Sequence, residues 1–209
     1  MTIFWLILIT IIAYLLGSIS TAILVGKMIS GDDIRSHGSG NAGATNALRT
    51  YGKVAAVFVT LGDCLKAVIA CILAILIARY TPLGTDNTAL AIYCAGFGAV
   101  LGHNFPLYFN FKGGKGILVS VTALMFAHWQ IALAVVIISI TIMAITKYVS
   151  LGSVIGSMLF IVFALIFELD NIAYVIFTTT LALLAIYKHK TNIIRLIKGT
   201  ESRLTDKKQ

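Results

Sequence analysis

Charged residues are scarce in this sequence. Asp, Glu, Lys and Arg make up 11% of its 209 residues, whereas hydrophobic residues make up 59%. Soluble domains usually carry about 25% charged residues, and one soluble core cannot bury this much apolar surface. A soluble globular fold is therefore excluded, and we expect lipid to cover much of the protein.

Cysteine is rare as well, and histidine shows no metal-ligand spacing. All the cysteines lie in apolar stretches, and none forms a Cys-x-x-Cys pair, which argues against a disulfide framework. The cysteines are Cys64, Cys71 and Cys94, and the histidines are His37, His103, His128 and His189. We therefore expect no metal site and no other cofactor.

The first apolar run lacks the features of a removed signal peptide. Residues Thr2–Leu16 contain neither a basic n-region nor a small-residue cleavage site, and the run continues to Val25, before Lys27. We expect a retained first membrane span.

Six apolar runs are candidate membrane spans, given that about 20 residues cross the hydrocarbon core. They are Ile3–Met28, Val54–Ala78, Ala89–Leu101, Ile117–Ile145, Val154–Phe167 and Ile172–Tyr187, of which the third can extend through Phe105. The fourth run is either one long tilted helix or a hairpin of two short helices that turns at residues 128–130. The chain accordingly has six or seven spans.

The lysines and arginines favour seven spans. With the N-terminus outside, seven spans place all 16 cations on the cytoplasmic side except Arg79 and Lys66, whereas six spans put the basic tail and the first connection on opposite faces. The two short helices must then tilt, thin the bilayer or pack as partial spans. We predict an all-α polytopic membrane protein with one domain over residues 1–209. Its net charge of +8 reflects this asymmetry and does not indicate nucleic-acid binding.

One acidic and one basic residue lie inside an apolar run. Asp63 and Lys66 are three residues apart, so they share a helix face and can form a pair. We favour pairing within the helix bundle over a direct catalytic role. The sequence also lacks the repeated broken helices of many transporters.

The first polar segment, residues 36–49, combines three glycines with short hydrogen-bonding side chains and an arginine. Glycine gives access to positive φ, the following helix start favours an anion, and the Arg49 fork suits phosphate. The candidate ligands of a phosphate group are Ser39, Gly40, Asn41, Thr45, Asn46 and Arg49. The alternative is an ordinary flexible loop.

The second polar segment, residues 102–116, ends in a glycine–lysine run in which backbone donors and ammonium groups can converge on phosphate. The run consists of Lys112, Gly113, Gly114, Lys115 and Gly116. It is not a Walker A motif, because glycine follows Lys115 and membrane spans flank the segment. A glycine turn that anchors cations at the cytoplasmic surface explains this segment equally well.

Two shorter segments also carry polar side chains. Residues 147–153 include Ser150 and Ser153, although hydroxyls at a helix start are commonly caps. In the tail, His189, Asn192 and Arg195 recur every three residues and so share one side of a helix. A basic tail held at anionic lipid accounts for the lysines there, but less well for His189 and Asn192.

Together these segments resemble those of the bacterial acyl-phosphate:glycerol-3-phosphate acyltransferases. The resemblance is carried by Gly38–Asn46 with Arg49, by Gly102–Pro106 with Phe111–Gly116, and by His189, Asn192, Arg195, Gly199 and Glu201. It covers nearly the whole chain, from the first span to the tail.

The resemblance implies a seven-helix fold in the bacterial inner membrane, with an active site that faces the cytoplasm. The implied reaction transfers a fatty acyl group from acyl phosphate to the sn-1 hydroxyl of glycerol 3-phosphate. It gives lysophosphatidic acid and phosphate and begins phospholipid synthesis. The family uses neither acyl-CoA nor acyl carrier protein directly, so the implied partners are the two substrates and membrane lipid.

The resemblance also suggests residue roles. Ser39 and Arg49 match active-site positions of the first motif, and Lys112 with its glycines matches the phosphate-binding second motif. His189 and Asn192 match activity-linked positions of the tail, and Glu201 matches a structural one. Either Ser150 or Ser153 matches a serine of a third motif, and the spacing leaves both open.

The expected chemistry needs no covalent intermediate. Acyl phosphate is a mixed anhydride with a good leaving group, and the sequence offers no recognisable nucleophile arrangement. Two clusters of donors and cations suit two phosphate-bearing substrates, whose orientation and charge stabilisation can supply most of the rate. The main alternative function is a transporter of phosphate or another anion.

Overall fold

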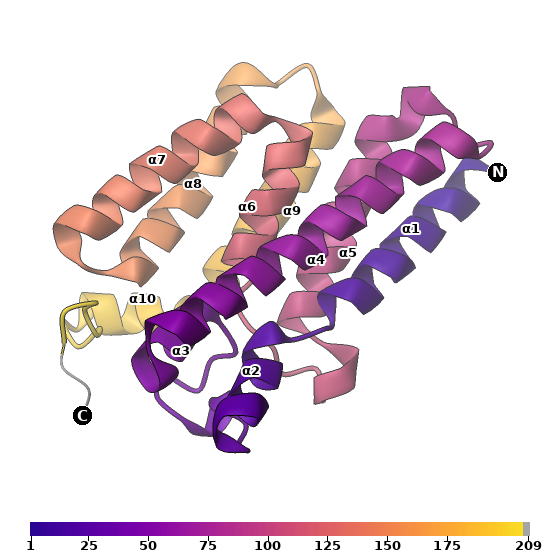
Figure 1. The fold of residues 1–209 in the computed structure, drawn as a ribbon. Helices are drawn as coiled ribbons and strands as arrows, with labels where there is room; N and C mark the ends of the chain where they lie inside the picture. Colours follow the sequence, from indigo (N-terminus) through magenta and orange to yellow (C-terminus); the bar gives the residue numbers. More distant parts are fainter. Residues whose placement is uncertain (207–209) are drawn as a thin grey trace. The chain divides into compact units, whose positions relative to one another are not determined.

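The regular structure of this chain is helical. The computed structural model describes residues 1–206, and in that range it contains no β-strand (Figure 1). The α-helices are α1 Thr2–Gly17, α2 Thr21–Ser30, α3 Ala44–Tyr51, α4 Lys53–Tyr80, α5 Thr88–Asn104, α6 Ile117–Ala127, α7 Trp129–Thr146, α8 Val149–Phe167, α9 Ile172–Lys188 and α10 Lys190–Ile197. The all-α prediction is thus confirmed. Two of the cations counted in the tail, Lys207 and Lys208, lie outside the described residues.

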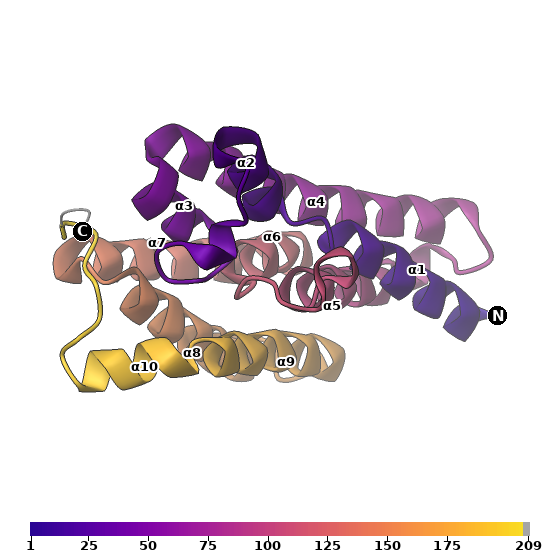
Figure 2. The same cartoon turned by 90° about the horizontal axis from the view of Figure 1, so that it is seen from below.

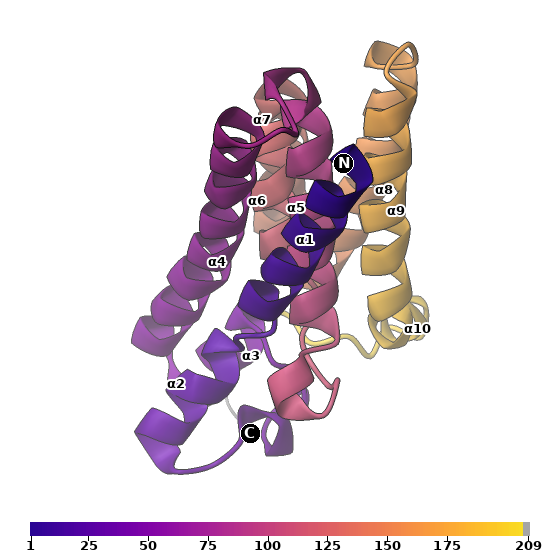
Figure 3. The same cartoon turned by 90° about the vertical axis from the view of Figure 1, so that its right-hand side faces the viewer.

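The helices form two compact units, Met1–Ala127 and His128–Gln209. The expectation of one domain over the whole chain stays a prediction. In the first unit, α1 runs along α5, and α4 packs against both (Figures 1 and 3). Glycines of α5 allow the close approach, because a methyl group at Gly98 would overlap the carbonyl oxygen of Thr10, and one at Gly102 that of Tyr14.

The first apolar run is broken in its middle. The sequence predicts it as one uninterrupted stretch, but α1 ends at Gly17 and α2 begins at Thr21. The hydroxyl of Ser18 donates to the carbonyl of Tyr14 and accepts from the amide of Leu107. The break therefore attaches the first span to the connection after α5.

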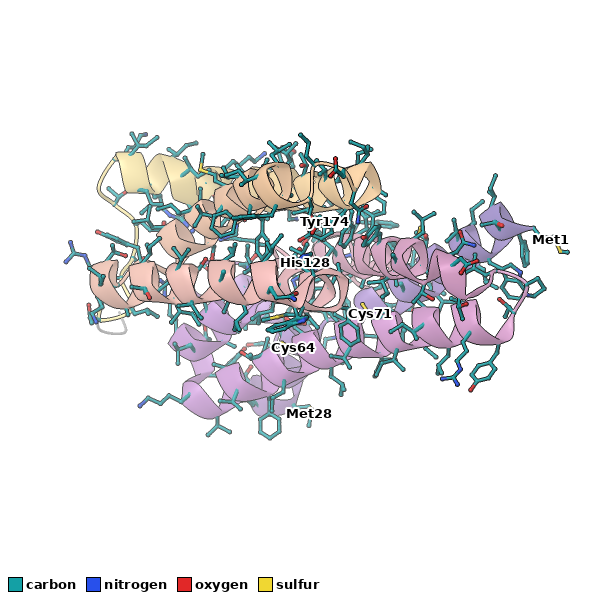
Figure 4. The ribbon with its side chains drawn as sticks, turned by 90° about the horizontal axis from the view of Figure 1, so that it is seen from above. Met1, Met28, Cys64, Cys71, His128 and Tyr174 are labelled. Atoms are coloured by element: carbon teal, nitrogen blue, oxygen red, sulfur yellow. The ribbon has the colours of Figure 1, made fainter. Side chains whose placement is uncertain are left out.

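In the second unit, α8 packs between α7 and α9, and α10 follows α9 at an angle of 59° (Figure 2). His128, before α7, lies 2.9 Å from the Glu168 carboxylate in the α8–α9 connection and packs against Tyr174 of α9 (Figure 4). At the other end of these helices, the amide of Leu204 donates to the carbonyl of Lys147. The segment that joins α7 to α8 and the tail therefore meet at the same end.

Five stretches in the described residues are long and apolar enough to cross a membrane. They are Thr2–Ser30, Lys53–Tyr80, Thr85–Phe109, Trp129–Thr146 and Val149–Phe167. The bent pair α9 and α10 is a sixth candidate if it forms one span.

A seventh span would have to be α6. The run Ile117–Ile145 is interrupted at His128, whose backbone angles of φ −156° and ψ 86° end the helix, at the place where the hairpin alternative turns. With 11 residues, α6 is about 16 Å long, which is well short of the hydrocarbon thickness. The count of seven and the orientation stay predictions.

Candidate active site

Arg35 connects the first polar segment to the second. A short 3-10 helix, Ile34–Ser36, places it beside Asp33, whose carboxylate accepts from the Arg35 amide and pairs with its guanidinium at 2.6 Å. The Nη1 atom of Arg35 then donates to the carbonyl oxygens of Phe109 and Lys112, at 2.9 and 2.7 Å. The hydrogen bonds from Arg35 hold the pKa of Asp33 below its usual value. The sequence alone marks Arg35 only as one of the cytoplasmic cations.

Asn46 shapes the loop of the first segment. Its side chain is 1% exposed. Its carbonyl oxygen accepts from the amide of Ser39 at 2.9 Å, and its amide nitrogen donates to the carbonyls of Ile34 and His37. These contacts hold the loop in shape, and the phosphate-binding role that the sequence suggests for Asn46 stays a prediction.

The same loop exposes its serine between two glycines. Gly38 and Gly40 have positive φ angles of 57° and 71°, and Ser39 between them is exposed. The chain then passes Asn41 and enters α3 at Ala44, so Thr45 lies in the first turn of that helix. Ser39, Asn41 and Thr45 therefore lie near the start of α3, whereas the partly buried Arg49 lies in its last turn.

The second segment folds back onto the end of α5. The amides of Gly113 and Gly114 donate to the carbonyls of Asn104 and His103. Gly114 is buried, and a methyl group there would overlap the His103 ring and the carbonyl oxygen of Ala42 in the first segment. Gly116, with a φ of 80°, fits closely against the side chain of Asn104.

The two lysines of the second segment flank this close-packed turn. Lys112 is exposed and Lys115 is partly buried. The first and second segments are therefore in direct contact, and both carry cations at the same end of residues 1–127.

A buried carboxylate organises the tail. Glu201 accepts hydrogen bonds from Ser150 and Asn192 on one oxygen, at 2.8 and 2.7 Å, and from Arg195 on the other at 2.7 Å. Burial opposes the charge on Glu201, but these donors outweigh it and lower its pKa. The prediction that Asn192 and Arg195 share one side of a helix agrees with their contact to the same group.

The remaining expected residues of this unit have more local contacts. Ser153 donates to the carbonyl of Val149 in its own helix, so Ser150 alone of the two serines joins the tail cluster. The Nδ1 atom of the buried His189 lies 2.8 Å from the carbonyl of Ala185. Across residues 1–206, no group of three or more His, Cys, Asp or Glu side chains is arranged to hold a metal.

Comparison with known proteins identifies the family. The family model described as glycerol-3-phosphate acyltransferase matches residues 7–199. The chain belongs to the glycerol-3-phosphate acyltransferase family. A glycerol-3-phosphate acyltransferase of Clostridioides difficile (strain 630) is 45% identical over 209 residues and covers all of both chains. One from Thermoanaerobacter sp. (strain X514) is also 45% identical, over 201 residues and 96% of each chain.

Solved structures of an acyltransferase in the same family have the same fold. The crystal structure of an integral membrane glycerol 3-phosphate acyltransferase in its glycerol 3-phosphate form is 31% identical. It matches with a TM-score of 0.83 and covers 95% of each chain. The form of that enzyme with lysophosphatidic acid is 30% identical, with a TM-score of 0.79 over 95% of this chain and 94% of the other. The resemblance seen in the motifs is therefore confirmed at the level of the family.

Proposed function

We propose that this protein transfers a fatty acyl group from acyl phosphate to the sn-1 hydroxyl of glycerol 3-phosphate at the cytoplasmic face of a bacterial membrane. The products are lysophosphatidic acid and inorganic phosphate, and the reaction is the first step of phospholipid synthesis. The observation that carries the proposal is the bond from Arg35 to the carbonyl of Lys112, which holds two phosphate-type segments against each other.

Each substrate carries a phosphate group, and the joined segments supply two sets of donors. We assign the exposed hydroxyl of Ser39, the start of α3 and Arg49 to one phosphate. The second set is formed by Lys112 and Lys115, which flank the glycine turn. Charge-assisted hydrogen bonds of this kind are about twice as strong as neutral ones, so they can hold both reactants and offset the charge that develops during transfer.

The proposed transfer is direct. The glycerol hydroxyl attacks the acyl carbonyl carbon, the bond to the phosphate oxygen breaks, and phosphate leaves with the electron pair. The hydroxyl proton passes to the leaving phosphate, to Ser39 or to His189. In the tail, the hydrogen bond that Asn192 donates to Glu201 fixes the orientation of its amide, and this orientation is the role we propose for the cluster.

A reconstituted assay tests the proposal. Purified protein in lipid vesicles is incubated with acyl phosphate and labelled glycerol 3-phosphate, and in parallel reactions acyl-CoA or acyl carrier protein replaces the donor. We expect labelled lysophosphatidic acid with acyl phosphate alone. Uptake of glycerol 3-phosphate into the vesicles without acylation would instead identify a transporter. A covalent acyl-protein trapped in a single turnover would rule out direct transfer.

A further inference from the structure

A buried polar cluster lies beneath the second segment. The ammonium group of Lys66 is 3.0 Å from the carboxylate of Asp63, 2.9 Å from the carbonyl oxygen of Ile19 and 2.9 Å from the Nδ1 atom of His103. The three side chains are between 2% and 8% exposed. They come from α4 and α5, and Ile19 lies in the break between α1 and α2.

The distances in this cluster favour one arrangement of its protons. A lysine ammonium has three donors and no acceptor, and here it faces the carboxylate of Asp63, the carbonyl of Ile19 and the Nδ1 atom of His103. We expect Nδ1 to accept from Lys66, because it lies closer to this ammonium group than to the carboxylate of Asp63, at 3.5 Å. The ring is then neutral with its proton on Nε2. With this arrangement the cluster carries one negative and one positive charge, so that neither charge is buried without a partner.

The far side of the His103 ring reaches the glycine turn. A methyl group at Gly114 would overlap Nε2, and the backbone carbonyl of His103 accepts from the Gly114 amide at 3.1 Å. The orientation of this ring consequently affects the position of the turn between Lys112 and Lys115. A charged pair that served stability alone would not need to extend to this turn.

We propose that Lys66 is a positioning residue for the phosphate-binding turn, and that it acts through His103. Asp63 holds the ammonium group in place, Lys66 fixes the tautomer and the ring plane of His103, and the ring supports Gly114. This inference rests on the proposed function of the second segment as a phosphate site. It assigns a role to two charges inside the membrane that the reaction itself does not use.

A charge-neutral double variant separates positioning from stability. Asp63→Asn with Lys66→Met removes both charges together, so no lone charge is left buried. Cys71→Ala is the matched control, because it shortens a buried side chain of the same helix outside the cluster. A misplacement of about 1 Å costs about a hundredfold in rate. We expect kcat/KM for glycerol 3-phosphate to fall about ten- to hundredfold in the double variant and to stay at the wild-type level in Cys71→Ala.

The thermal stability of each variant is measured beside its kinetics. A folded double variant with wild-type kcat/KM would overturn the proposal. The proposal would also be overturned if the double variant and the Cys71→Ala control lost activity to the same extent at equal thermal stability. If the wild-type protein itself forms no lysophosphatidic acid, the proposed function fails, and weakened binding of inorganic phosphate by the double variant remains the measure of the positioning role.

A spectroscopic measurement decides the proposal if the double variant does not fold. The ¹⁵N spectrum of histidine-labelled wild-type protein reports the tautomer of each ring, and the His103→Gln spectrum identifies the signal of His103. We expect a neutral ring protonated at Nε2 that stays so in Lys66→Arg, which keeps a donor at this position. A ring protonated at Nδ1, or a charged ring, contradicts the proposal.

Discussion

The guanidinium of Arg35 lies 2.7 Å from the carbonyl oxygen of Lys112, a residue 77 positions further along the chain, and so joins the start of the first polar segment to the second. A second bond from the same nitrogen atom reaches the carbonyl of Phe109. Asp33 occupies the other side of the guanidinium. The relative position of the two phosphate-type segments thus depends on one planar side chain, which lysine cannot replace.

Arg35→Lys tests this dependence. The ammonium group keeps the charge, but it cannot bond to Asp33 and to both carbonyls in the same plane. We expect the loss of one charge-assisted bond, about 1.5–3 kcal/mol, to lower kcat/KM for acyl transfer by about one to two factors of ten. Arg79→Lys, at the far end of α4, is the control and should leave the kinetics unchanged. Equal activity of the two variants would show that the bond from Arg35 has no bearing on the site.

Arg49→Ala tests the first segment directly. We expect the use of glycerol 3-phosphate to weaken by one to two factors of ten, which corresponds to about 1.5–3 kcal/mol for a charge-assisted bond to phosphate. Lys53→Ala removes an exposed cation four residues further along the chain and should change little. The measurement is the dependence of the initial rate on glycerol 3-phosphate concentration. An unchanged KM and kcat in Arg49→Ala would remove this residue from the site.

Two neighbouring serines provide a matched pair for the tail cluster. Ser150 donates to the buried Glu201, whereas Ser153 donates to a carbonyl of its own helix. Ser150→Ala should therefore destabilise the protein by about 1–3 kcal/mol, because the buried carboxylate of Glu201 then loses one of its hydrogen-bond donors. Ser153→Ala should cost less. Thermal unfolding in detergent compares the two, and a larger loss in Ser153→Ala would contradict the arrangement.

Glu201 should make the stability depend on pH. Its donors hold its pKa below the ordinary value of 4.5, so the folded state binds a proton less readily than the unfolded chain does. The stabilisation is fully present above 4.5 and is lost as the pH falls through the lower, folded pKa. Glu201→Gln should cost about 1.5–3 kcal/mol near pH 7. Its deficit in melting temperature against the wild type should shrink in acid, whereas Asp170→Asn at an exposed position should show no deficit.

The membrane helices were largely predictable because a long apolar run has few alternatives to a helix in lipid. The run Val54–Ala78 lies within α4, and Ile172–Tyr187 lies within α9. The two breaks differ in how far the sequence predicts them. The interruption at Ser18 depends on a partner in the connection after α5, so the apolar run alone does not reveal it. The break at His128 lies where the distribution of cations already favours a hairpin over one long helix.

The candidate site was predictable as a set of segments but not as a set of contacts. Glycines and cations mark residues 36–49 and 102–116 by their type alone. In contrast, Asn46 looks in the sequence like any candidate phosphate ligand, and Arg35 looks like any surface cation. Their roles follow from carbonyl groups of the backbone, which every residue carries, so no side-chain pattern reveals them. A pair such as Asp33 and Arg35, two residues apart before a glycine-rich loop, is the one local signal of this arrangement.

The break between α1 and α2 has a consequence for the order in which the protein assembles in its membrane. The first span leaves the carbonyl of Ile19 outside any helical ladder, and its partner, the ammonium group of Lys66, belongs to a helix that is synthesised later. Lipid offers no donor to such a group. The first span of the nascent protein is therefore incomplete on its own, and the arrival of α4 satisfies a backbone group and a buried cation in the same step.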